Sequence, residues 1–206
     1  MSEFLEAMAF RHACKRFDTE KQIPSEQFES ILEVCRTSPS SFGMEPWRVI
    51  VVRNEKLRKA LKASCWNQNQ IIECSELVVF TTDNDTVRSD SPYVRKMFER
   101  RGLSAEAVDT YLGVYGNYLK PLEEDELLLE NWTAKQCYIA MANMMTYAAT
   151  LKIDSCPIEG FDKEEVEAIL DIEYGCSVAV MCAFGYRVNP QSEQKRLTLK
   201  QIIEYR

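Results

Sequence analysis

The chain of 206 residues carries a formal net charge of −7, with 46% hydrophobic and 28% charged residues. This composition is typical of one globular domain and argues against a disordered chain. The acidic balance argues against nucleic acid or an anionic membrane as the main partner, because both require clustered cations.

Helices are predicted where apolar residues recur with helical spacing. They cover residues 3–12, 25–37, 55–65, two pieces of 91–119 divided around Gly102, and 126–152. Strands are predicted where β-branched and apolar residues run together. They cover residues 47–52, 76–82 and 177–187. We therefore expect an α+β fold in which widely separated strands are connected through helices.

The later part of the chain has three further features. The helix over 126–152 is apolar on most faces, which predicts that it is central and buried and favours a dimer interface. Residues 154–160 are predicted to form a turn and a short extended piece. Asp162 is expected to cap the next helix, with Glu165 at the capping-box position. From residue 189 onward the tail is polar.

Histidine and cysteine narrow the chemistry. His12 is the single histidine, which excludes a metal site with two or three imidazole ligands, and no metal is expected. The eight cysteines include no CxxC pair, and several, such as Cys137 and Cys182, lie in apolar runs. We interpret them as reduced core residues of a cytoplasmic protein. With so few acid–base side chains, catalysis is expected to depend on a cofactor.

Targeting segments are not expected. The N-terminus begins acidic and has no basic region followed by an apolar core, so it does not resemble a signal peptide. The most apolar long stretch, residues 134–151, is interrupted by polar and charged residues, so no transmembrane helix is predicted.

Four segments hold candidate functional residues, and each has a plain structural alternative. Three cations in 11–16 suit a phosphate, or form a solvated patch at a helix end. The loop 38–47, rich in Ser and Pro, allows close ligand approach, or simply connects helix to strand. The turn 157–162 can present backbone N–H groups, or only caps a helix. The tail pair Lys195-Arg196 binds an anion or is solvated. Neither a GxGxxG nor a P-loop motif is present.

Together, in this order, the four segments resemble the FMN-dependent nitroreductases, and are nearest the oxygen-insensitive bacterial subgroup. The motifs are RxxxK near the N-terminus, SPSSF…PW after the second helix, PIEGFD after the long helix, and the late basic pair. The resemblance implies a three-layer α/β/α sandwich that forms an intertwined homodimer around the long central helix. It also implies that residues 1–206 form one FMN-binding domain, whose tail from about residue 189 to 206 contributes to the site or to the dimer.

The resemblance implies that FMN lies at the dimer interface. Arg11 and Lys15 would contact its phosphate or the polar edge of the flavin, and Lys195 and Arg196 would add to the phosphate clamp. Asn67 and Gln70 would face the ribityl chain and the pyrimidine ring, and backbone N–H groups of Glu159 and Gly160 would face flavin N5. Apart from the loop that the other subunit would contribute, the implied FMN-binding residues are Arg11, His12, Ala13, Lys15, Asn67, Gln70, Gln136, Pro157, Ile158, Glu159, Gly160, Lys195 and Arg196.

The second subunit would contribute the loop residues Pro39, Ser40, Ser41 and Gly43. Trp66, Phe42 and Tyr118 would line the substrate side. Five positions depart from the usual pattern. Ala13 replaces a phosphate-binding Ser, Gln70 replaces a Lys, and Gly43-Met44-Glu45 replaces Asn-Ser-Gln.

The implied reaction is ping-pong. NADH or NADPH reduces the flavin and leaves, and a nitroaromatic, a quinone or a similar electron-poor small molecule then takes the two electrons at the same face. The sequence leaves open the choice between NADH and NADPH and the identity of the physiological acceptor. It also leaves open a flavin-binding regulatory or carrier protein with little turnover, or another flavin reaction on the same scaffold.

Overall fold

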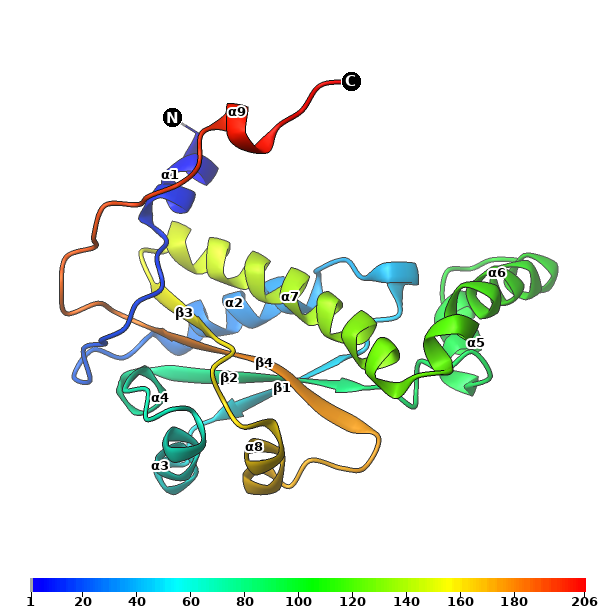
Figure 1. Cartoon of the computed structure of the whole chain (residues 1–206), viewed down its shortest axis with the longest axis horizontal. Coiled ribbons are helices and arrows are strands. Elements are labelled where there is room, and N and C mark those ends of the chain that lie inside the picture. The colour runs from blue at the N-terminus through cyan, green and yellow to red at the C-terminus, as the bar shows by residue number, and fades with distance from the viewer. Residues whose placement is uncertain (1) are drawn as a thin grey trace.

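The computed structural model describes residues 2–206, and its centre is a four-stranded antiparallel sheet (Figure 1). The strands are β1 (Trp47–Val52), β2 (Glu76–Asp83), β3 (Asp154–Ile158) and β4 (Cys176–Gly185), in the spatial order β1-β2-β4-β3. The three predicted strands are confirmed within one or two residues at their ends. The short extended piece predicted within 154–160 is a fourth strand, because five of these residues pair with β4, a pairing that the sequence did not predict.

Pro157 explains why the sequence does not mark β3 as a paired strand. Proline cannot donate to a β-ladder and is normally confined to edge strands. β3 lies at the edge of the sheet, where Pro157 pairs opposite Cys182 of β4 on one side only. The pairing that makes it a strand comes from residues more than 20 positions away, and so leaves no local pattern.

Helices cover both faces of the sheet, which confirms the three-layer sandwich (Figure 1). The long helix α7 (Glu126–Thr150) and α2 (Ser25–Arg36) lie on one face. The helices α3 (Glu55–Ser64), α4 (Gln70–Glu73) and α8 (Lys163–Leu170) lie on the other. Successive side chains of a strand point to opposite faces. In β2, Val78 and Phe80 therefore pack with α7, whereas Leu77 and Val79 pack with α3, α4 and α8.

Two helices, α5 (Pro92–Glu99) and α6 (Ala105–Glu123), project from the sandwich and have their own apolar core (Figure 1). Their division around Gly102 is confirmed, and this glycine has a φ of +70°, which stops a helix at little steric cost. α6 continues to Glu123, past the predicted end at residue 119. Pro121 lies in its last turn, where it removes a single helical hydrogen bond.

The two ends of the chain lie side by side near the C-terminal end of α7 (Figure 1). Helix α1 (Glu3–Phe10) packs on α7 and is shorter than predicted, because Arg11 has extended backbone angles. The tail contains a short helix, α9 (Leu199–Ile202), which begins at a capping box between Thr198 and Gln201. Among the described residues, no helix combines the length and apolar character that crossing a membrane requires.

Candidate functional site

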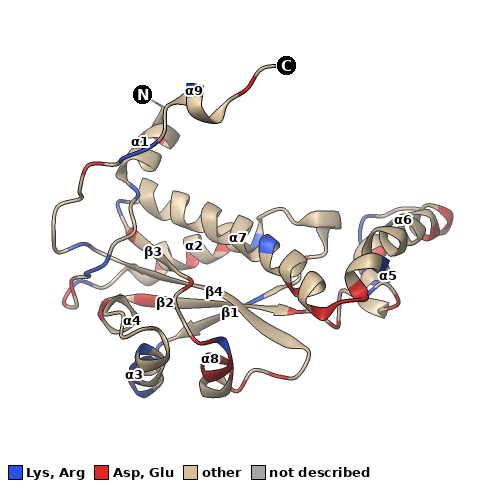
Figure 2. Ribbon diagram, in the orientation of Figure 1, with Lys and Arg blue, Asp and Glu red and all other residues tan. Residues whose placement is uncertain are grey.

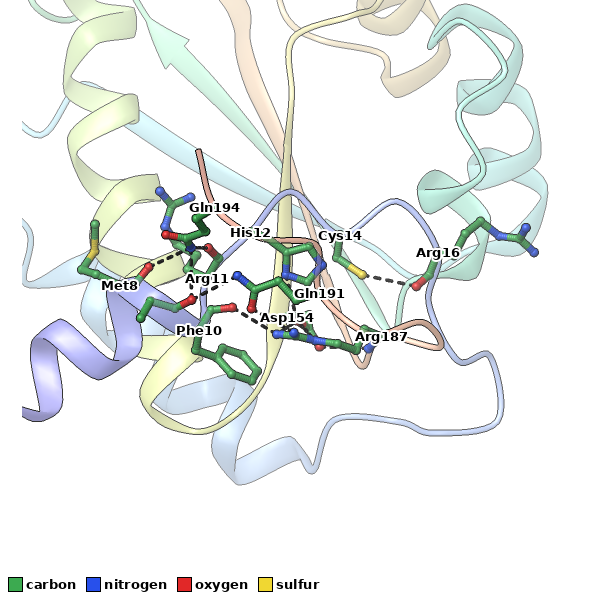
Figure 3. A network of polar contacts seen from close by, with 11 residues as sticks. Met8, Phe10, Arg11, His12, Cys14, Arg16, Asp154, Arg187, Gln191 and Gln194 are labelled. Atoms are coloured by element: carbon green, nitrogen blue, oxygen red, sulfur yellow. Dashed lines mark hydrogen bonds and ion pairs between the residues drawn. The ribbon is translucent and has the colours of Figure 1, made fainter. Parts of the chain in front are cut away.

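An ion pair between Asp154 and Arg187 joins the start of β3 to the chain that leaves β4 (Figure 3). Asp154 is 4% exposed. Its carboxylate accepts a hydrogen bond from the Arg187 backbone N at 2.9 Å, one from Nε at 2.7 Å, and lies 2.5 Å from Nη2. A carboxylate and a guanidinium joined by several bonds have little freedom to rearrange. The pair therefore fixes the edge of the sheet.

The C-terminal end of α1 is capped by side chains from the end of β4 and from the tail (Figure 3). Arg187 donates from Nη2 to the Phe10 carbonyl at 3.1 Å. Gln191 and Gln194 donate from Nε2 to the Ala9 carbonyl at 3.0 and 3.1 Å. The last carbonyls of a helix have no partner within it, so these bonds satisfy groups that otherwise need water. They also set the direction in which the chain leaves α1.

The segment after α1 runs along β3. The Ala13–Ser155 pair forms a parallel bridge, in which the next amide donates to the Ser155 carbonyl at 3.1 Å. Lys15 donates from Nζ to the Cys156 sulfur at 3.5 Å, and Gln70 of α4 donates to the same sulfur at 3.8 Å. Three of the predicted FMN-binding residues, from two distant parts of the sequence, are thus brought together around β3.

A cleft opens beside this segment. It has a volume of about 180 Å³, and its lining residues are His12, Ala13, Cys14, Lys15, Arg16, Arg187, Asn189, Pro190 and Ser192. Among residues 2–206, neither Arg11 nor Lys15 forms an ion pair with a carboxylate. Figure 2 shows acidic residues gathered along α8 and at the junction of α6 and α7, away from this cleft. Of the described residues that line the cleft, Lys15 is thus the cation without a carboxylate partner, since Arg16 pairs with Glu73 and Arg187 with Asp154, and it suits an anionic group such as a phosphate.

His12, Cys14 and Asp154 have potential ligand atoms within 4.8 Å of one another. The Asp154 carboxylate is nevertheless engaged by Arg187, whose positive charge opposes a bound cation. Burial, followed by the charge of Arg187, holds the pKa of His12 below its usual value, although Asp154 acts in the opposite direction. Burial also raises the pKa of the Cys14 thiol to about 11. Both groups are therefore uncharged near neutral pH.

The turn after β3 is held by the loop between α3 and α4. Gln68 donates from Nε2 to the Gly160 carbonyl at 2.8 Å and accepts from Gln70 at 2.7 Å. A Cβ at Gly160 would lie 2.5 Å from the Trp66 ring, so only glycine fits with the ring in this position. The Tyr138 hydroxyl of α7 donates to the Glu159 carboxylate. A continuous chain of contacts therefore links Lys15 and Gln70 to the 157–160 turn.

Trp66 and Asn67 have φ angles of 51° and 55°. Left-handed backbone is uncommon for residues other than glycine, and for a bulky side chain it is an outlier. Such conformations gather at functional sites, where the surrounding structure maintains them. Trp66 is also 75% exposed, which leaves its ring accessible from solvent.

The remaining predicted residues form a second group. The Ser41 amide donates to Oε1 of Gln136 in α7 at 2.8 Å, and the Ser40 hydroxyl accepts from a backbone amide of the same loop at 2.9 Å. The Phe42 ring packs on Tyr118 of α6, with ring centroids 5.4 Å apart. The loop of residues 39–45 therefore rests on α6 and α7.

The two groups lie on different sides of α7, because Gln136 contacts Ser41 of the second group whereas Tyr138, two positions later in the helix, contacts Glu159 of the first. Figure 1 places α1 at one end of the molecule and α6, which carries Tyr118, at the other. Lys195 and Arg196 lie in the tail near α1 and are exposed. A single copy of the chain thus brings the predicted residues together as two half-sites rather than as one site.

Some of the residues that organise the site are missed by sequence reasoning. Asp154 lies in a segment interpreted as a turn, and Arg187 ends a strand, so neither offers a motif. Gln191 and Gln194 lie in a polar tail whose contacts with α1 have no local signal. Gln68 is the exception, because it lies in the polar run CWNQNQ that also contains the predicted residues Trp66, Asn67 and Gln70.

The sandwich, its projecting helix pair and the cation-rich cleft at the sheet edge define an α+β protein that has helices on both faces of its sheet and is suited to an anionic ligand. Comparison with known proteins gives the family. The family model described as "Nitroreductase family" matches residues 8–186. The chain belongs to the nitroreductase family.

Two curated relatives named "Putative NAD(P)H nitroreductase" support the assignment. The one from Staphylococcus haemolyticus is 38% identical and is matched over 98% of this chain and 96% of its own length. The one from Staphylococcus epidermidis is 42% identical, over 93% and 90%.

Solved structures agree in fold. A nitroreductase family protein from Streptococcus pneumoniae superposes with a TM-score of 0.80 at 25% identity, covering 98% of this chain and 100% of that one. A "putative nitroreductase in complex with FMN" from Exiguobacterium sibiricum has a TM-score of 0.82 at 20% identity, covering 100% and 98%.

Proposed function

We propose that the chain is an FMN-dependent oxidoreductase that takes reducing equivalents from NADH or NADPH and passes them to small electron-poor acceptors such as nitroaromatics and quinones. The observation that carries the proposal is the continuous set of polar groups from Lys15 through Gln70 to Gly160 beside a cation-rich cleft. The relatives named as NAD(P)H nitroreductases and the FMN-bound structural neighbour support it.

The residues present fit FMN. Arg11 and Lys15, which have no carboxylate partner among the described residues, would bind the phosphate, and Lys195 and Arg196 of the tail would add to this clamp. Side chains such as Asn67 and Gln70 would face the ribityl chain and the ring. Gly160, which has no side chain, would let the flavin approach the backbone of the turn that contains Pro157, Ile158 and Glu159.

The bound FMN supplies the two-electron chemistry. The chain's own groups bind and orient it, and His12, whose pKa is lowered by burial, would meet it as a neutral imidazole. Ala13 offers no hydroxyl to the phosphate, so more of the binding energy is assigned to Arg11 and Lys15. Gln70 brings a neutral amide where relatives of this kind carry a cation, so the flavin has one positive charge fewer beside it.

We also propose that the chain works as a homodimer. In one copy the two half-sites lie on different sides of α7, with Gln136 turned toward one and Tyr138 toward the other, and the cleft of about 180 Å³ is smaller than the roughly 300–1,000 Å³ of complete ligand pockets. A second copy would supply the loop with Pro39, Ser40, Ser41 and Gly43, together with Phe42 and Tyr118. Exposed apolar side chains support an interface: Phe4, Leu5, Val114 and Leu127 are 53–61% exposed.

Sedimentation tests the dimer. Obligate interfaces bury about 2,000 Å² or more, so dissociation is not expected at micromolar concentration. A monomer that retains bound flavin at that concentration would contradict the shared site. We further propose that residues 1–206 form one FMN-binding domain that acts in the cytoplasm. All eight cysteines are free thiols, seven of them buried, which fits a reducing compartment.

The test of the function is rapid anaerobic mixing of the purified yellow protein with NADH or NADPH while the flavin absorbance is followed. Fast bleaching, followed by recovery when a quinone is added, is the expected result. Bound flavin that bleaches only slowly would instead indicate a regulatory or carrier protein. A colourless protein that gains no flavin spectrum on incubation with FMN would refute the proposal.

A further inference from the structure

The turn that contains Phe42 is held by the projecting helix α5. Three consecutive backbone carbonyls, those of residues 42–44, each accept a hydrogen bond from a side chain in or directly after α5. Tyr93 donates from Oη to the third carbonyl at 2.9 Å, and Arg100 from Nη2 to the second at 3.3 Å. Arg101 donates to the first. The carbonyls of this turn are therefore satisfied by another element, whereas its amides bond within the loop.

The turn needs such support because its conformation is strained. Phe42 has a φ of 51° and Glu45 a φ of 48°, both left-handed, with Gly43 at 62° between them. A residue with a side chain persists in this region only when its surroundings fix it. The Glu45 carboxylate also pairs with the guanidinium of Arg100. This pair depends on a glutamate at one of the positions where the chain departs from the usual Asn-Ser-Gln.

Arg101 is itself held in place. Its guanidinium lies 4.8 Å from the centroid of the Phe98 ring and 5.8 Å from that of Tyr111, both in the helix pair. A cation placed above the face of an aromatic ring is attracted to it, which stabilises this position of the guanidinium. A Cβ at Gly43 would lie 3.1 Å from Arg101 Nη2, so the guanidinium packs closely on the turn as well as bonding to it. Arg101 thus bridges the turn and the helix pair.

The backbone of this turn sets the position of the Phe42 ring. Its ring meets Tyr115 edge-on, with centroids 5.1 Å apart, and Tyr118 at 5.4 Å. We propose that Arg100 and Arg101 are positioning residues that set the acceptor selectivity of the enzyme by holding the turn of residues 42–45 and thereby the ring of Phe42. The inference rests on the proposed function, in which Phe42 and Tyr118 line the acceptor pocket.

The consequence for selectivity follows from size. Without the guanidinium groups, the carbonyls of the turn bond to water and the backbone relaxes toward negative φ, which moves the Phe42 ring. An acceptor with two fused rings depends more on the position of the Phe42 ring than an acceptor with a single ring, because the larger acceptor contacts more of the ring surface. Hydrogen bonds from a charged donor are about twice as strong as neutral ones, so the two arginines dominate the hold on the turn.

The experiment compares Arg100→Ala and Arg101→Ala with Arg95→Ala in the full-length holoprotein. Arg95 is a matched control, because it lies on the same helix, pairs with Asp109 and Glu99, and makes no contact with the turn. The measured quantity is the ratio of kcat/KM for menadione to kcat/KM for 1,4-benzoquinone. We expect this ratio to fall about tenfold in the Arg101→Ala variant, or about 1.4 kcal/mol, and to stay unchanged in the control.

Two further measurements separate positioning from general damage. Arg101→Lys keeps a cationic donor and is expected to restore part of the ratio. Amide hydrogen exchange at residues 42–46 is expected to speed up in Arg100→Ala and Arg101→Ala but not in Arg95→Ala. FMN content is measured in every variant, and the ratio is compared only in protein that retains its flavin, because Gly43 of the same turn is one of the residues proposed to contact FMN.

The outcomes are distinct. An unchanged ratio in both alanine variants, with FMN and flavin bleaching intact, overturns the inference and leaves the proposed function standing. An equal change in Arg95→Ala also overturns it. If Arg101→Ala loses FMN or the dimer, the ratio in Arg101→Lys and Arg100→Ala decides by the same criterion. A wild-type chain that holds no FMN and reduces neither quinone overturns the proposed function and this inference together.

Discussion

Asp154→Ala is expected to be the most informative single change in the chain. The substitution removes a carboxylate that is 4% exposed and leaves Arg187, whose side chain is 20% exposed, without its charged partner. Breaking one side of a buried ion pair costs about 3–5 kcal/mol, because the remaining charge stays desolvated. Arg187 keeps its hydrogen bonds to the Phe10 carbonyl and to Gln191 and is partly exposed to solvent, so the cost is expected at the lower end of this range.

We therefore expect the free energy of unfolding to fall by about 3 kcal/mol. For a chain of this size each kcal/mol shifts Tm by about 2–4 °C, so Tm should fall by about 6–12 °C. FMN binding should weaken as well, since the pair fixes the strand along which Lys15 lies.

The assay is urea unfolding, followed by circular dichroism at a fixed protein concentration and a fixed excess of FMN, because both affect apparent stability. Arg53→Ala is the control. It breaks a pair with Glu76 in which the arginine side chain is 68% exposed, and should cost at most about 1 kcal/mol. A double-mutant cycle of Asp154→Ala with Arg187→Ala should give a coupling of about 2 kcal/mol. An Asp154→Ala loss no larger than that of the control, or a coupling near zero, would refute the reasoning.

Three further predictions concern the site. Arg11→Ala should weaken FMN binding by about 1.5–3 kcal/mol, the range for a hydrogen bond to a charged group, and unchanged affinity by flavin fluorescence titration would remove Arg11 from the site. Tyr118→Ala should change kcat/KM unequally among nitroaromatics and quinones while FMN content stays intact, whereas a uniform loss with lost FMN would show a structural role. His12 gives a single imidazole NMR signal, which in the flavin-free protein should titrate below its usual pKa of 6.5, because burial outweighs Asp154. As pH falls, the unfolded chain therefore binds a proton at His12 before the folded chain does. The contribution of His12 to the free energy of unfolding is thus present above pH 6.5 and is lost as pH falls toward the folded pKa. A titration midpoint of His12 above 6.5 in the folded protein would contradict this.

Much of the fold could be predicted because its signals are local. Strands 47–52 and 76–82 are runs of β-branched residues, and the helix over 126–152 is a long apolar stretch, so each pattern lies within a few turns of chain. The ordered motifs also predicted the family correctly. They identified Lys15, Gln70 and Gly160, which the structure connects through consecutive hydrogen bonds.

What only the tertiary structure decided are the contacts between distant residues. Asp154 meets Arg187 across 33 positions, and Gln194 meets the end of α1 across more than 180. The edge strand around Pro157 exists because β4 pairs with it, and the turn at Phe42 keeps its strained backbone because α5 holds it. No periodicity marks these contacts, since a pair of side chains far apart in sequence is specified by the packing of the whole chain. The division of the predicted site into two half-sites has the same origin, because α7 lies between them, with Gln136 turned toward one and Tyr138 toward the other.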